Sequence, residues 1–121
     1  MNHDHGKAVL DDLAPLSREL RRAIPDVYKG FRDLHHAAFE AGALDTKTKE
    51  LIALAIAVTE HCDGCIASHA QGAFRAGATR QEAAEALGVT ILMQGGPATI
   101  YAPRAYAAFC GFEEAAGTVA Q

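Results

Sequence analysis

Apolar residues recur along most of the chain at steps of three and four, the spacing that places side chains on one face of an α-helix. The pattern is interrupted near Pro25, Gly42, Gly77 and Gly95, residue types that end helices or start turns. It therefore predicts an all-α fold, a bundle of about six helices over residues 11–24, 26–41, 46–59, 63–76, 80–94 and 98–115. Pro15 suits the first turn of the first helix.

The third predicted helix begins with charged residues and then becomes apolar on every side, from Leu51 to Val58. A helix that is apolar all round must be covered all round. One small subunit can hardly do this, so we expect a homo-oligomer. The first two helices each carry an inner apolar stripe, formed by Leu13, Leu16, Leu20, Ala23 and Ile24 in one and by Val27, Phe31, Leu34, Ala38 and Phe39 in the other.

With 121 residues, half of them apolar, the chain is long enough for one core and too short for two independent ones. We expect a single domain over residues 1–121, with its core at about 25–115 and flexible ends at 1–10 and 117–121. The polar first residues lack the apolar segment of a signal peptide, which favours the cytoplasm. No apolar run approaches the ~18 residues of a membrane span, so we expect no membrane partner.

The formal net charge of −4 argues against a nucleic-acid partner, because such binding depends on neutralising phosphates with basic side chains. The strongest local excess of positive charge is interleaved with acidic residues and reads as a solvated helix face. It consists of Arg18, Arg21, Arg22, Lys29 and Arg32, among Glu19, Asp26 and Asp33.

The candidate chemistry follows the apolar helix, where Cys62, Cys65 and His69 stand at steps of three and four. That spacing puts the three side chains in one line on one helix. Cys62 lies where the apolar run ends, so we expect the cysteine pair to open a new helix, with free amide N–H groups beside the sulfurs. Such a position favours the thiolate, which is the reactive form of cysteine.

Glu50 lies on the preceding helix, and a turn near residues 59–61 would make the two helices an antiparallel hairpin. Glu50 then lies roughly 15 Å from the turn, His69 roughly 11 Å and Cys65 roughly 5 Å, so the histidine is between the carboxylate and the thiol. A carboxylate can orient an imidazole that takes a proton from a thiol, and a second thiol one turn away can resolve the oxidised sulfur.

The four residues together resemble the core motif of the alkylhydroperoxidase AhpD-like proteins, within the carboxymuconolactone decarboxylase superfamily. The motif consists of Glu50, eleven intervening residues, Cys62-x-x-Cys65, three intervening residues and His69. The segment 92–102 is also similar to the sequence that follows this motif in the superfamily. Together the matching parts cover most of the chain.

This resemblance implies an all-helical subunit that forms trimers or hexamers and has peroxidase or disulfide-reductase activity. By motif position, Cys65 would be the peroxidatic cysteine and Cys62 the resolving cysteine, with Glu50 and His69 as the proton relay. The implied partners are a hydroperoxide or small disulfide and a dithiol or reductase protein, with no cofactor or metal. The best-studied members carry a histidine directly before the second cysteine, where this chain has Gly64, so the relay is one group shorter.

Other functions fit the same residues. One alternative is a zinc site, because zinc suits the ligand types of Cys62, Cys65, His69 and Glu50. Three ligands along one helix are, however, awkward to bring to one ion. A non-redox reaction on a small organic acid or lactone, as in the decarboxylase branch of the superfamily, gives the two cysteines no obvious use. A binding or scaffold role with a vestigial motif is a further alternative.

Two adjacent histidines stand in the predicted helix 26–41. His35 and His36 lie about 100° apart around it, so they cannot both face one site. We expect one of them at the core or at a subunit contact and the other in water. Cys110 has no nearby partner in the sequence and is expected to be a small buried apolar residue.

Overall fold

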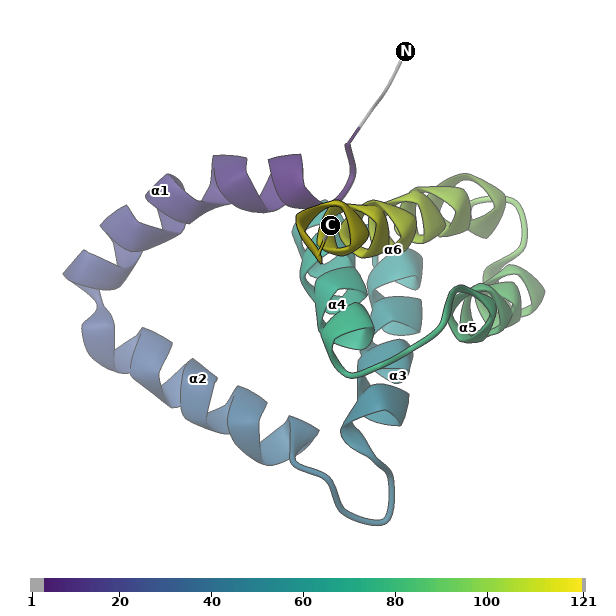
Figure 1. Ribbon diagram of the computed structural model, residues 1–121. Coiled ribbons are helices and arrows are strands. Elements are labelled where there is room, and N and C mark those ends of the chain that lie inside the picture. The colour runs from purple at the N-terminus through teal and green to yellow at the C-terminus, as the bar shows by residue number, and fades with distance from the viewer. Residues whose placement is uncertain (1–3, 121) are drawn as a thin grey trace.

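The computed structural model describes residues 4–120, and all regular elements in that range are α-helices, as predicted. They are α1 (Lys7–Ala23), α2 (Pro25–Phe39), α3 (Thr46–Thr59), α4 (Asp63–Arg75), α5 (Arg80–Gln94) and α6 (Ala98–Ala120). Figure 1 shows α3 to α6 gathered on one side of the molecule, while α1 and α2 form an arm that reaches away from them and returns.

The core lies among α3, α4, α5 and α6. Helix α4 packs against α3 and α6, and α5 packs against the same two helices from another side (Figure 1). Leu54 and Val58 of α3 and Phe109 of α6 are the largest fully buried side chains. Most of the other buried positions are alanines, and such small side chains let the helices approach closely.

Two N-terminal caps fix where the core helices begin. Asp45 caps α3 by accepting a hydrogen bond from the Thr48 amide at 2.7 Å, and hydrogen bonds from the Thr48 side chain and amide lower the pKa of Asp45. Thr79 and Glu82 form the predicted capping box at the start of α5. Glu82 also accepts a hydrogen bond from Lys47 at 2.8 Å, which lowers the pKa of the carboxyl group and joins the first turns of α3 and α5.

The arm of α1 and α2 differs from the prediction, because neither helix has a buried residue. Most of the predicted inner stripes are open to solvent, with Leu16 67% exposed, Phe31 65% and Leu34 63%. Helix α1 contacts α4 and α6, and α2 contacts α1 and α3, but within residues 4–120 no element covers most of these apolar faces. The two helices are amphipathic, as predicted, but their apolar faces are not part of the core.

Both ends of the helical region extend further than predicted. Helix α1 begins at Lys7 because Asp4 accepts hydrogen bonds from the Gly6 and Ala8 amides, so Pro15 lies inside the helix. Helix α6 continues to Ala120, beyond the predicted end at residue 115. The predictions for residues 1–3 and 121 fall outside the described residues. None of the helices in residues 4–120 is long and apolar enough to cross a membrane.

Candidate functional site

The turn between α3 and α4 sets the position of the first cysteine. His61 reverses the chain with a left-handed backbone at φ 56°. Its ring stacks on Tyr101 at 4.2 Å between centroids, and the Gln94 side-chain amide donates a hydrogen bond to the Thr59 carbonyl at 3.0 Å. Residues of the segment 92–102 therefore hold the turn that delivers Cys62 to the start of α4.

The two cysteines open α4, as predicted. Cys62 is the N-cap residue of α4, and its sulfur accepts a hydrogen bond from the Cys65 amide at 3.2 Å. The two sulfurs are joined as a disulfide, with the Cα atoms 5.2 Å apart. Cys65 is exposed and Cys62 is half-buried, so a solvent-borne reactant reaches Cys65 more easily. The pair can therefore pass between a dithiol and a disulfide without large backbone movement.

Glu50 and His69 meet across the α3–α4 hairpin. Nδ1 of His69 lies 3.0 Å from Oε2 of Glu50, and the Glu50 residue is only 6% exposed. With the carboxylate ionised, Nδ1 carries the hydrogen and donates it to Glu50. That tautomer leaves Nε2 of a neutral His69 free to accept a proton, as a general base must.

Gly72 makes room for this contact and was not singled out by the sequence. It follows His69 by one turn on α4, and a Cβ atom at Gly72 would overlap all three outer atoms of the Glu50 carboxyl group. The missing side chain therefore lets a carboxylate from α3 lie directly against the α4 backbone. Spacing alone could not reveal this requirement, because it arises from the neighbouring helix.

His35 and Phe39 of α2 also belong to the site. The His35 and His69 ring centroids are 6.2 Å apart with an interplanar angle of 10°. The ring centroid of Phe39 lies 4.6 Å from that of His35 and 5.5 Å from that of His69. Sequence reasoning gave His35 no role, although steps of four place it between Phe31 and Phe39 on the apolar stripe. His35 is the one whose ring contacts His69, and His36 is exposed to solvent, as expected for one of the two histidines.

An apolar cleft of about 330 Å³ leads to the reactive groups. Its walls come from α2 and α3, and Cys65 and His69 line it as well. The lining consists of Phe31, Leu34, His35, Ala38, Phe39, Ala53, Ile56, Ala57, Glu60, Cys65 and His69. A second cleft of about 620 Å³ reaches Glu50 and His35 from the side of Thr46. The site is thus open to solvent from two directions.

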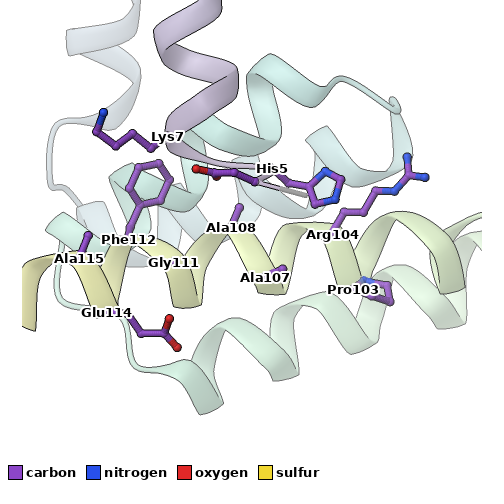
Figure 2. A pocket seen from close by; sticks show the side chains of 11 residues that line it. His5, Lys7, Pro103, Arg104, Ala107, Ala108, Gly111, Phe112, Glu114 and Ala115 are labelled. Atoms are coloured by element: carbon purple, nitrogen blue, oxygen red, sulfur yellow. The ribbon is translucent and has the colours of Figure 1, made fainter. Parts of the chain in front are cut away.

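A larger cleft, of about 790 Å³, lies between the start of the described chain and α6 (Figure 2). His5, Lys7 and Arg104 surround it, and Phe112 points into it. It contains none of the four residues predicted for the site, so the geometry concentrates the chemistry at the hairpin instead.

The zinc set that the sequence offers as an alternative does not come together. Cys62 and Cys65 are bonded to each other, and within residues 4–120 neither joins a cluster of converging ligand atoms. The side chains that do converge are His35, Glu50 and His69, whose ligand atoms lie within 4.8 Å of one another.

The fold and the site define a class of small all-helical proteins with a C-x-x-C pair at a helix start. The carboxymuconolactone decarboxylase family model matches residues 25–108, and the chain belongs to this family. An uncharacterized protein from Cupriavidus necator is 42% identical over 90 residues, which cover 74% of this chain and 80% of the relative.

Solved structures agree with this assignment. A carboxymuconolactone decarboxylase family protein from Legionella pneumophila, in its apo form, has a TM-score of 0.86 and 42% identity, covering 91% of this chain and 98% of its own. A family member from Thermotoga maritima has a TM-score of 0.78 and 27% identity, and the match covers 95% of this chain and 97% of that protein. Involvement of that protein in an antioxidative response has been suggested.

Replacing Gly72 with alanine should displace the Glu50 carboxyl group and break its hydrogen bond to His69, because the new Cβ atom occupies the same space. We expect overpacking to lower the free energy of unfolding by about 1–3 kcal/mol. Nitrogen-15 NMR of the His69 ring should show loss of the single Nδ1–H tautomer.

Gly88→Ala is the matched control, since a Cβ atom there meets nothing within 4 Å. In that helix position alanine should leave the His69 ring spectrum unchanged and stabilise the protein by up to about 1 kcal/mol. An unchanged His69 spectrum in the Gly72→Ala protein would contradict the steric argument.

Proposed function

We propose that the protein is a thiol-dependent enzyme that reduces hydroperoxides or small disulfides through Cys65 and Cys62. The observation that carries the proposal is the joint position of Cys65 and His69 in one apolar cleft, with His69 held by the buried Glu50. A thiol, a base and a group that orients the base are the components of an activated cysteine nucleophile.

In the proposed reaction, His69 accepts the proton of the Cys65 thiol through Nε2. The thiolate attacks the outer oxygen of the hydroperoxide, the O–O bond breaks, and the proton on His69 goes to the departing alkoxide, which leaves as an alcohol. Cys65 is then a sulfenic acid. The Cys62 thiol displaces water from this sulfur, and the product is the Cys62–Cys65 disulfide.

A dithiol or a reductase protein would complete the cycle. Its thiolate attacks the disulfide, and a second thiol of the donor releases the protein as the dithiol while the donor becomes a disulfide. The exposure of Cys65 supports direct access by such a donor. A cycle of this kind suits the cytoplasm, where such donors keep thiols reduced.

The shape of the cleft bears on the substrate. Its walls are mainly alkyl and aromatic groups, which favour a hydroperoxide with an apolar organic part over hydrogen peroxide. Gly64 contributes no side chain beside Cys65, so proton delivery in this chain would depend on His69 and Glu50 alone.

We also propose a homo-oligomer, a trimer or a hexamer. The apolar faces of α1 and α2 are exposed over two consecutive helices, with Leu20 51% and Val27 63% exposed. Contiguous apolar surface of this kind marks an interaction site. A second copy of the chain would cover it and would also complete the outer wall of the apolar cleft, which α2 forms.

Cys65→Ser should abolish turnover of an organic hydroperoxide such as cumene hydroperoxide, because a hydroxyl group at this position cannot form a sulfenic acid. Cys62→Ser should still react once and stop as the sulfenic acid, which mass spectrometry after trapping would detect. Cys110→Ser is the control and should keep full activity. Turnover by the Cys65→Ser protein at the wild-type rate would overturn the scheme.

Leu20→Glu should shift the assembly toward monomers, since it places a charge on the apolar face of α1. Arg18→Glu, on the opposite side of the helix, is the control and should leave the assembly intact. Analytical ultracentrifugation of the three proteins checks this, and a monomeric wild-type protein would contradict the proposal.

A further inference from the structure

The proposed reaction uses Glu50 and His69 but gives no task to His35, whose ring lies beside them. Nδ1 of His69 is 3.0 Å from Glu50, and one nitrogen of His35 completes a group of three ligand atoms within 4.8 Å of one another. His35 and His69 are half-buried and Glu50 is buried, so these are not three exposed polar groups that happen to be neighbours. They come from three different helices, α2, α3 and α4.

We propose that His35, Glu50 and His69 form a binding site for a divalent transition-metal ion, with zinc as the best-suited probe. Two imidazoles and one carboxylate form one of the ligand sets found at open zinc sites, in which a fourth position is left to water or another molecule. The same donor set suits other first-row divalent ions. The site shares Glu50 and His69 with the zinc alternative weighed from the sequence, and His35 takes the place of the two cysteines.

The geometry is close to what an ion requires. Two ligand atoms that are each about 2.1 Å from a tetrahedral zinc ion lie about 3.4 Å apart. Nδ1 of His69 and Oε2 of Glu50 are 3.0 Å apart and already lie within this distance. The widest separation among the three ligand atoms is at most 4.8 Å and exceeds it by no more than about 1.4 Å. Metal binding would therefore draw the His35 side chain toward the other two.

Phe39 supports the arrangement of the two rings. It lies against both His35 and His69, while those two rings are within 10° of parallel. An aromatic ring that covers two imidazoles leaves their edges, which carry the nitrogens, free to converge. The cleft lined by His35, Glu40 and Glu50 gives an ion a path from solvent past two carboxyl groups.

Occupation of this site would have a consequence for the reaction, and this part rests on the proposed function. An ion bound between Glu50 and Nδ1 of His69 takes the place of the Nδ1 hydrogen. The neutral ring then carries its hydrogen on Nε2, which can no longer accept a proton from Cys65. Metal binding and activation of Cys65 would therefore exclude each other, so zinc would act as a reversible inhibitor of thiol oxidation.

The test uses untagged full-length protein in the disulfide form, with Cys110→Ser, so that no free thiol can bind the metal. Isothermal titration with ZnCl₂ should give about one ion per chain. His35→Ala removes one of the three ligands and should weaken binding by at least about tenfold, because even the loss of a residue that only orients a ligand lowers metal affinity about 10- to 100-fold. His36→Ala removes the adjacent histidine and should bind zinc as the parent protein does.

A second measurement does not depend on any variant at the site. Nitrogen-15 NMR of the parent protein should show the ring signals of His35 and His69 shifting together as zinc is added, with those of His36 unchanged. The proposal is overturned if the disulfide protein binds no zinc at about 100 µM, or if His35→Ala binds as tightly as the parent. Because the disulfide form is inactive as a thiol, this result is independent of whether the reduced protein turns over peroxide.

Discussion

The hydrogen bond between Glu50 and His69 is the interaction on which the site depends. It joins α3 to α4 at 3.0 Å in a place where the carboxyl group is almost fully removed from water. A buried carboxylate is stable only with a partner, and here the partner is the imidazole beside the cysteine pair. Gly72 leaves the space for it, and the turn at His61 sets the position of His69 on α4 relative to Glu50 on α3.

The arm of α1 and α2 connects the site with the proposed association of subunits. Helix α2 supplies one wall of the apolar cleft, together with His35 and Phe39, yet most of its apolar surface has no cover from its own chain. If a second subunit covers that surface, the same contact fixes α2 against His69. Assembly and the shape of the site would then depend on the same helix.

Much of the architecture could be predicted from the sequence, because helix periodicity and caps are local. The six helices, the capping box at Thr79 and the opening of α4 by Cys62 are all found. Contacts between distant segments are not visible in local patterns. The spacing therefore indicates neither the contact of His35 with His69 nor the space that Gly72 leaves for Glu50. The sequence does not show why the segment 92–102 resembles the family. In the structure, Gln94 and Tyr101 of this segment support the turn between α3 and α4.

The most direct test of the central claim measures the rate at which the reduced protein reacts with cumene hydroperoxide, before any recycling step, in the wild type and in Glu50→Gln. Stopped-flow mixing with mass spectrometry of the Cys62–Cys65 peptide gives this rate constant. If Glu50 orients His69 to activate Cys65, the substitution should lower it on the order of a hundredfold while the fold is retained. Equal rate constants for the two proteins would contradict the account.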